Sequence, residues 1–204
     1  MKLYYTKGAC SLAARIIINE LALTCEYEAV DLKTKRTEKN QDFLQINPKG
    51  AVPTLETKNG EILTENAVIQ QYLAEEANAT QLLPMMGDFK RYRVLEWLNY
   101  VATELHKGFG PLFNPSVDKK TKDEIFIPLL QAKFNYIDQQ LQSKPFLLDT
   151  FTLPDAYLFV MIFWSLHFKF PLSSSWPHLS RYFTQLQTRQ SIQHALNEEG
   201  LTIK

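Results

Sequence analysis

The sequence predicts an α/β domain followed by an all-helical domain. Within the first 80 residues, short stretches with strand-like alternation take turns with stretches of helical periodicity. Beyond residue 88 only helical spacing recurs. The segment 77–88, with Pro84 and Gly87, breaks both patterns. We therefore expect two domains in this chain of 204 residues, at 1–80 and 88–204, joined by a linker at 81–87.

The first domain is expected to contain a mixed sheet. The predicted elements, in chain order, are a strand at 2–6, a helix around 13–21, a strand at 25–31, strands at 52–57 and 61–64, and a helix at 66–77. Asn59-Gly60 between the last two strands is a strong hairpin signal. The helix at 66–77 has Val68, Ile69, Tyr72 and Leu73 on one face. A β-α-β unit gives parallel pairing and a hairpin gives antiparallel pairing.

The second domain is expected to contain at least four helices, around 94–105, 130–141, 154–169 and 178–190. Thr152-Leu-Pro-Asp155 predicts a capping box at the start of the third helix, with a structural role. The apolar run at 156–168 is shorter than the ~20 residues that cross a bilayer. It is therefore expected to be a buried core helix.

Composition excludes several classes of protein. Lysine plus arginine equals aspartate plus glutamate at 22 each, which argues against a nucleic-acid-binding or membrane-binding protein. The two cysteines, Cys10 and Cys25, are too few for a disulfide framework and lack metal-type spacing, so no metal site is expected. The N-terminus has no apolar run of signal-peptide length. A reducing cytoplasm is the expected location.

Cys10 lies between a predicted strand and a predicted helix. The unpaired N–H groups at a helix N-terminus stabilise a thiolate. Ser11 is the expected N-cap, and its hydroxyl can donate to a nearby sulfur anion. A small cysteine packed under the sheet is the alternative for Cys10, and it is the expected state of Cys25.

Val52-Pro53 stands at the start of a predicted strand, where proline marks an edge or a special turn. If this bond is cis, the carbonyl and N–H of Val52 are expected to face a groove and to pair with an extended peptide. An ordinary tight turn is the alternative.

Glu65 and Asn66 stand where the hairpin ends and a helix begins. A helix N-terminus suits a carboxylate, and an acidic side chain beside it suits an ammonium group. Together they are suited to an amino-acid zwitterion such as a γ-glutamyl end. A simple Asn66 N-cap with an acidic neighbour is the alternative.

These stretches, in this order, resemble a glutathione S-transferase of the bacterial beta class. "KLYYTKGACSLAARI" (2–16) resembles the start of that class, and "INPKGAVPTL" (46–55) its cis-proline segment. "LTENAVIQQYLAE" (63–75) is similar to its γ-glutamyl-binding segment, and "FTLPDAYLF" (151–159) to its capping box. The resemblance covers nearly the whole chain.

The resemblance implies an α+β thioredoxin-like N-terminal domain, an all-α C-terminal domain and a homodimer. It implies glutathione as co-substrate, with Cys10 facing its sulfur and able to form a mixed disulfide. The implied catalytic residues are Tyr5, Cys10, Ser11 and His106. The implied glutathione-binding residues are Lys35 at the glycyl carboxylate, Val52 with Pro53 at the cysteinyl backbone, Glu65 and Asn66 at the γ-glutamyl end, Lys107 beside His106 at the sulfur, and Asn99, Thr103 and Glu104, which reach the neighbouring subunit's glutathione.

The sequence departs from the family pattern at several positions. Asn66 replaces a usual serine, and binding is expected to survive in weaker form. Ala14 and Arg15 replace a usual proline and histidine, and Arg15 is expected either to add positive potential or to be solvated. Thr103 replaces a common serine.

The expected function is activation of the glutathione thiol for attack on small apolar electrophiles, a detoxification reaction. Thiol–disulfide exchange or peroxide reduction through Cys10 is expected beside it. A few of the aromatic residues of the second domain are expected to line the electrophile pocket. A glutathione-dependent isomerase or dehalogenase, and a non-catalytic binding protein on the same scaffold, are the alternatives.

Overall fold

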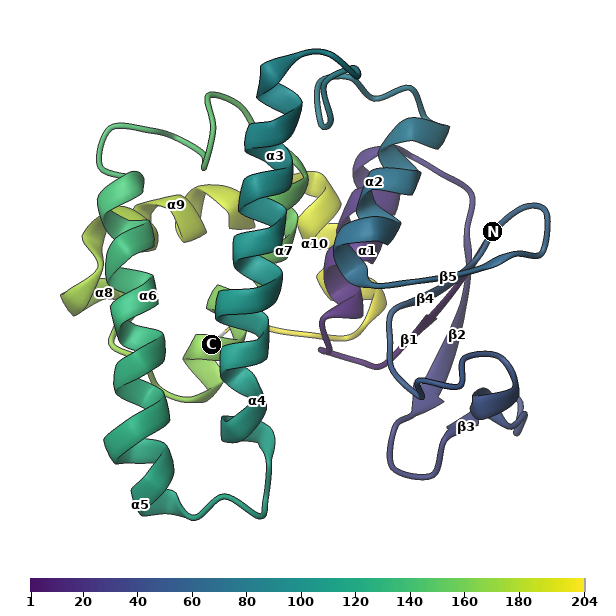
Figure 1. Cartoon of the computed structure of the whole chain (residues 1–204), viewed down its shortest axis with the longest axis horizontal. Coiled ribbons are helices and arrows are strands. Elements are labelled where there is room, and N and C mark those ends of the chain that lie inside the picture. The colour runs from purple at the N-terminus through teal and green to yellow at the C-terminus, as the bar shows by residue number, and fades with distance from the viewer. Residues whose placement is uncertain (204) are drawn as a thin grey trace. The chain divides into compact units, whose positions relative to one another are not determined.

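The computed structural model describes residues 1–203, which form two compact units (Figure 1). Unit 1 comprises Met1–Pro84 together with the chain from Thr188 onward, and unit 2 comprises Met85–Gln187. This division differs from the expected domains in one respect. The segment after Thr188, which we expected in the helical domain, packs with unit 1.

Unit 1 is built on a five-stranded mixed sheet with the order β3-β2-β1-β4-β5. The strands are β1 (Lys2–Tyr5), β2 (Glu26–Asp31), β3 (Arg36–Thr37), β4 (Thr54–Glu56) and β5 (Ile62–Thr64). β1 pairs parallel with β2 and antiparallel with β4, and β4 pairs antiparallel with β5. The predicted mixed sheet is confirmed. The strand β3, which spans two residues, was not predicted, because two residues are too few to show a periodicity.

Three α-helices accompany this sheet: α1 (Ser11–Glu20), α2 (Asn66–Glu76) and α10 (Gln190–Glu198). A short 3₁₀ helix, η1 (Phe43–Gln45), lies in the long loop between β3 and β4. Helix α1 packs against both α2 and α10, as Figure 1 shows, and every residue from Ser11 to Ile18 is buried. The predicted helix, with one apolar face, therefore accounts for only part of the buried residues of α1.

The buried face of α2 differs from the predicted one. Ile69 and Leu73 are fully buried as expected, but Val68 is 43% exposed. Asn66 and Gln70 are buried instead, and the Gln70 Nε2 donates a hydrogen bond to the Asn66 Oδ1 at 3.2 Å. The Asn66 Oδ1 thus has a donor, whereas within the described residues the buried Gln70 Oε1 has no hydrogen-bond partner.

The regular elements of unit 2 are all helices, with no strand among its described residues. Its α-helices are α3 (Phe89–Tyr100), α4 (Lys107–Phe113), α5 (Lys119–Thr121), α6 (Ile127–Gln140), α7 (Leu153–His167), α8 (Leu172–Ser175) and α9 (Pro177–Gln187). Two π-helical segments, η2 (Val101–His106) and η3 (Lys122–Phe126), join α3 to α4 and α5 to α6. The four predicted helices are present. The π-helical turns were not predicted, because the apolar spacing resembles that of an α-helix.

Helix α7 is the core of unit 2, with all residues from Leu153 to Ile162 buried. Its predicted capping box is confirmed. The Asp155 carboxylate accepts from the Thr152 N–H at 2.8 Å, from the Leu147 N–H at 3.0 Å and from the Tyr182 hydroxyl at 2.7 Å. Three segments of unit 2 are thus tied to the first turn of α7.

Candidate functional site

Cys10 lies at the N-terminus of α1, as the sequence predicts. Its side chain is buried, with 6% of the residue exposed, and its thiol donates to the Val52 carbonyl oxygen at 3.2 Å. Cys10 itself, and not Ser11, is the N-cap residue. The helix N-terminus favours a sulfur anion, whereas the Val52 carbonyl accepts a hydrogen bond only from the protonated thiol.

The prediction that Ser11 caps α1 is wrong. Ser11 is the first helical residue, and its hydroxyl lies 3.3 Å from both the N–H and the carbonyl oxygen of Thr6. These bonds hold the strand end β1 to the start of α1. The hydroxyl donates to the Thr6 carbonyl in this arrangement, so it is engaged with the backbone and not with a sulfur atom.

The Val52-Pro53 peptide bond is cis, and the tight-turn alternative is not needed. The carbonyl of Val52 is taken by the Cys10 thiol, which the sequence did not predict. Within residues 1–203 the Val52 N–H donates to no acceptor. The Val52 side chain packs with Tyr4, Val30 and Phe43 in a small buried cluster. This backbone position is therefore fixed from behind and open for pairing at its N–H.

Two polar side chains brace the loop that carries Val52. The buried Asn47 Nδ2 donates to the Ala51 carbonyl and to the Thr54 hydroxyl, each at 2.9 Å. The Lys35 Nζ donates to the Gly50 carbonyl at 2.7 Å. Lys35 was predicted from the family resemblance, but Asn47 was missed. The Asn47-Pro48 turn signal was the feature in the sequence that pointed to it.

The start of α2 combines a strained residue with unpaired amides. Glu65 has φ 71° and ψ 115°, and its carboxylate pairs with the Lys49 ammonium at 2.7 Å. Within residues 1–203 the N–H groups of Asn66 and Ala67 donate to no acceptor. Such amides at a helix N-terminus are suited to a carboxylate ligand. A strained non-glycine residue of this kind is often retained at a functional site.

Asn66 is not the N-cap that one alternative predicted, because Glu65 holds that position. The Asn66 side chain is 5% exposed, and its Nδ2 donates to the Cys10 carbonyl oxygen at 2.7 Å. Its amide group thus joins the first residue of α2 to the residue that precedes α1. The side chain supports the site from within unit 1.

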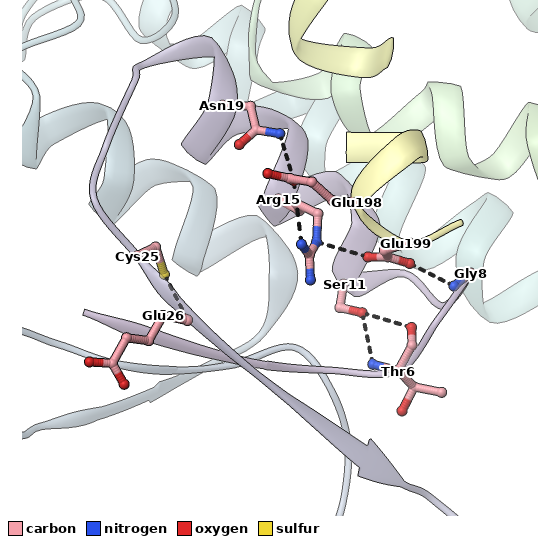
Figure 2. A network of polar contacts seen from close by, with 9 residues as sticks. All are labelled: Thr6, Gly8, Ser11, Arg15, Asn19, Cys25, Glu26, Glu198 and Glu199. Carbon is pink, nitrogen blue, oxygen red and sulfur yellow. Dashed lines mark hydrogen bonds and ion pairs between the residues drawn. The ribbon is translucent and has the colours of Figure 1, made fainter. Parts of the chain in front are cut away.

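Arg15 is buried, so of the two alternatives for this residue the solvated side chain is wrong. Its guanidinium carbon lies 3.7 Å from the ring centre of Tyr27 and 4.3 Å from that of Tyr5. Its Nε pairs with Glu199 at 3.1 Å and its Nη1 with Glu198 at 3.4 Å, as Figure 2 shows. Both carboxylates come from the end of α10 and the residue after it. Two aromatic faces and two carboxylates compensate for the loss of hydration of the cation.

This network reaches the loop before Cys10. The second Glu199 oxygen accepts from the Gly8 N–H at 2.8 Å (Figure 2). Burial raises the pKa of the Glu199 carboxyl, although the Gly8 amide and the Arg15 charge act in the opposite direction. The Tyr5 ring packs against the guanidinium of Arg15.

Cys25 stands just before β2, not inside the predicted strand, and is only half-buried. Its thiol donates to the Glu26 carbonyl at 3.3 Å (Figure 2), and burial raises its pKa. These features fit an unreactive structural thiol.

His106 is the last residue of the π-helical segment η2 in unit 2. Its Nδ1 lies 2.6 Å from the hydroxyl oxygen of Tyr157, and its ring meets the Trp164 ring edge-on at a centroid distance of 5.3 Å. Phe113 also packs edge-on against Trp164 at 4.9 Å. The imidazole is therefore held on an aromatic surface. Tyr157 was missed in the sequence, because a tyrosine within an apolar helix reads as core.

The other predicted residues of unit 2 lie along α3, η2 and α4. Asn99, Thr103 and Lys107 are exposed. The Thr103 hydroxyl donates to the Asn99 carbonyl at 3.0 Å, so the expected i, i+4 proximity is present. Glu104 pairs with Lys133 of the same chain at 2.6 Å, and this hydrogen bond lowers the pKa of the Glu104 carboxyl. Its carboxylate thus has a partner within its own unit.

Two family models match this chain. The glutathione S-transferase N-terminal domain matches residues 1–75, and the glutathione S-transferase C-terminal domain matches residues 100–190. The chain belongs to the glutathione S-transferase family. It is also 40% identical over 202 residues to glutathione S-transferase GstA of Escherichia coli O157:H7, covering 98% of this chain and 100% of that protein.

Solved structures of other glutathione S-transferases have the same fold as this one. A ternary complex of BphK, a bacterial member, is 41% identical and superposes with a TM-score of 0.94 over 98% of this chain and 100% of that one. The bacterial beta-class enzyme of Sphingomonas chungbukensis is 36% identical, with a TM-score of 0.95 over 99% of this chain and 100% of that one. The predicted family, its beta-class character and its fold are confirmed.

The described residues lack two kinds of feature. None of the helices within residues 1–203 has the length and apolar character needed to cross a membrane. The same residues contain no group of three or more histidine, cysteine or acidic side chains arranged to hold a metal ion.

Proposed function

We propose that this glutathione S-transferase binds glutathione along the Cys10, Val52 and α2 edge of unit 1 and activates its thiol for attack on small apolar electrophiles. The observation that carries the proposal is the position of the Cys10 sulfur at the N-terminus of α1, 3.2 Å from the Val52 carbonyl. This contact places the N-terminus of α1 next to Val52, whose backbone N–H can pair with an extended peptide.

The donors and charges of unit 1 match the parts of glutathione in order. The Val52 N–H is suited to the cysteinyl carbonyl by strand-like pairing. The amides at the start of α2 suit the γ-glutamyl carboxylate, and the Glu65 carboxylate suits the ammonium group. The Lys35 ammonium, which braces Gly50, is proposed to attract the glycyl carboxylate.

The thiolate needs more than the helix N-terminus. That effect is worth ~0.3–1 kcal/mol when exposed and up to ~2 kcal/mol when partly buried, or about one pKa unit. Ser11 is engaged with Thr6, so it does not supply the remainder. We propose that His106 does, with Lys107 adding positive charge. This assignment is supported by the family resemblance and by the fixed imidazole.

We propose a slower exchange reaction through Cys10. Its thiolate attacks one sulfur of a mixed disulfide of glutathione, forming Cys10–S–SG and releasing the other thiolate. A second glutathione thiolate then attacks the sulfur of the bound glutathione, releasing oxidised glutathione and the Cys10 thiolate. The Cys10 thiol must first leave the Val52 carbonyl and give up its proton. Its burial, with 6% exposed, makes this step slow.

We propose that the working form is a cytoplasmic homodimer. The support is the family membership together with large exposed apolar side chains at the start of α3, where Phe89 is 66% and Tyr92 is 58% exposed. Asn99, Thr103 and Glu104 lie further along the same helical stretch. Sedimentation equilibrium tests the dimer, and a monomer at working concentration would refute it.

The test compares the native chain with Cys10→Ala, using Cys25→Ala as the matched control. Initial rates of glutathione conjugation to an activated chloronitrobenzene are measured beside calorimetric titration with glutathione. We expect glutathione binding in all three proteins, retained conjugation in Cys10→Ala, and loss only of glutathione-dependent disulfide reduction. Failure of the native chain to bind glutathione would favour the non-catalytic alternative. Binding without conjugation would favour the isomerase or dehalogenase.

A further inference from the structure

We propose that Tyr157 is a positioning residue that fixes the tautomer of His106. Its hydroxyl oxygen lies 2.6 Å from the His106 Nδ1. In this proposal the phenol donates to Nδ1 and the ring proton of His106 stays on Nε2. The tautomer itself follows from unit 2 alone. Only its consequence for glutathione rests on the function proposed above.

Tyr157 is held rigidly enough to impose a geometry on His106. The residue is 2% exposed and belongs to α7. Two residues before it, Asp155 accepts from the Thr152 N–H at 2.8 Å and from the Leu147 N–H at 3.0 Å. The capping box therefore fixes the start of the helix that carries Tyr157.

The imidazole is restrained from other directions as well. The Trp164 ring packs on it at 5.3 Å with an interplanar angle of 63°, and the Tyr157 ring lies at 5.7 Å with an angle of 67°. His106 also ends the π-helical segment η2. Single π-helical turns inside helices are frequent at functional sites. The extra residue in this turn changes the direction of the side chain relative to a continuous α-helix.

The direction of the hydrogen bond follows from acidity. A neutral imidazole has one N–H donor and one acceptor nitrogen. A phenol, with a usual pKa of ~10, is a much stronger hydrogen-bond donor than a neutral imidazole N–H. The phenol therefore donates to Nδ1, which leaves the proton on Nε2. An Nε2–H group can then donate to a sulfur anion, and the opposite tautomer would present only a lone pair.

The first experiment reads the tautomer directly and does not depend on activity. Two-bond ¹H–¹⁵N correlation spectra resolve the four histidines of the full chain at about pH 8, where imidazole is neutral. The spectrum of His106→Asn identifies the His106 signals. We expect the Nε2–H pattern for His106 in the native protein. An Nδ1–H pattern, or an even mixture, would overturn the proposal without any variant having to fold.

The variant arm uses Tyr157→Phe, with Tyr182→Phe as the matched control. Both remove one buried hydroxyl from unit 2, but the Tyr182 hydroxyl donates to Asp155 at 2.7 Å. We expect Tyr157→Phe to convert His106 to a mixture of tautomers and Tyr182→Phe to leave its signals unchanged. Equal spectral changes in both variants would reduce Tyr157 to a packing role.

Kinetics provide a second readout. We expect Tyr157→Phe to lower kcat for conjugation by about tenfold, the lower end of what loss of an orienting partner costs a histidine in metal sites. KM for glutathione should stay within about twofold, because the contact is made in unit 2 and not to the peptide. In a His106→Asn background the same substitution should have no further effect. Additive effects would overturn the proposal, whereas an inactive native protein would refute the proposed function and leave the tautomer measurement valid.

Discussion

At the scale of single residues, Asn66 stands at a position where the family resemblance leads us to expect serine. Its Nδ2 donates to the Cys10 carbonyl, and its Oδ1 accepts from Gln70. A serine hydroxyl offers one donor on a shorter side chain. The asparagine therefore makes the junction between α1 and α2 part of the buried structure, while its backbone N–H stays available to a ligand.

We predict that Asn66→Ala lowers the free energy of unfolding by about 1–3 kcal/mol. The buried Gln70 amide loses its acceptor, and the Cys10 carbonyl loses one donor while it keeps the Ala13 N–H. Urea unfolding measures this loss. Asn66→Ser should retain glutathione binding, since the helix amides remain. The control is Gln71→Ala on the half-buried face of α2, for which we expect a change within about 0.5 kcal/mol. Equal stability of Asn66→Ala and Gln71→Ala would contradict the prediction.

Glu28 is a buried carboxylate of β2 that two lysines approach, with Lys2 and Lys39 each at 3.5 Å. Burial opposes its ionisation, but the Thr37 side chain and the two lysine charges outweigh this and lower its pKa. A carboxyl with a lowered pKa stabilises the fold above its ordinary value of 4.5. That contribution is lost as the pH falls through the folded-state value.

We predict that Glu28→Gln costs about 1–2 kcal/mol of unfolding free energy at pH 7. The difference from the native protein should shrink as the pH is lowered below 4.5. Urea titrations at pH 7, 5 and 3.5 provide the measurement. A difference that is constant over this range would show that the lost contribution is not ionic.

At the scale of elements, the first turn of α7 is hydrogen-bonded to several other parts of unit 2. One fully buried carboxylate, Asp155, accepts bonds from the loop before the helix, from the N-cap and from α9. Burial raises its pKa, and the donated hydrogen bonds act in the opposite direction. A capping box here positions a helix as well as starting it.

We predict that Asp155→Ala lowers the unfolding free energy by about 3–5 kcal/mol, because several buried donors lose their acceptor at once. The matched control is Asp118→Ala. Asp118 is an exposed N-cap of α5, so its loss should lower the unfolding free energy much less. Thermal and urea unfolding compare the two variants. A loss no larger than that of the control would mean that the Tyr182 and Leu147 contacts add nothing.

The sequence predicted elements well where periodicity or a local motif determines them. The hairpin at Asn59-Gly60 and the Thr152–Asp155 capping box depend on neighbours in sequence, and both are present. Predictions were wrong or incomplete where distant segments decide. From its sequence neighbours Arg15 is expected to be a surface charge. It is buried because Glu198 and Glu199, from the other end of the chain, pair with it. The Cys10–Val52 bond and the Tyr157–His106 contact likewise join residues far apart in sequence.

At the scale of the whole molecule, the chain leaves unit 1 at Pro84 and re-enters it at Thr188. Helix α10 then packs on α1, and its end supplies the carboxylates that pair with Arg15. The first 84 residues therefore lack part of their own core and the counter-charges of a buried cation.

We predict that a chain ending at Gln187 loses hydrogen-exchange protection throughout α1, whereas the amides of α7 in unit 2 stay protected. Glu199→Gln in the full chain keeps the apolar contacts of α10 and removes a charge. It should cost about 3–5 kcal/mol, as for a broken buried ion pair. Mass-spectrometric hydrogen exchange resolves the two units. Undiminished protection of α1 in the shortened chain would show that α10 is dispensable.

The return of the chain to unit 1 also sets an order in time. Roughly a hundred residues of unit 2 are synthesised between the two parts of unit 1. At about 5–20 residues per second, the ribosome spends on the order of ten seconds on them. During that interval α10 has not been translated, so Arg15 lacks its carboxylate partners and the apolar surface of α1 is uncovered. Unit 1 is thus begun first and completed last. While it is incomplete, its apolar surface is exposed to chaperones.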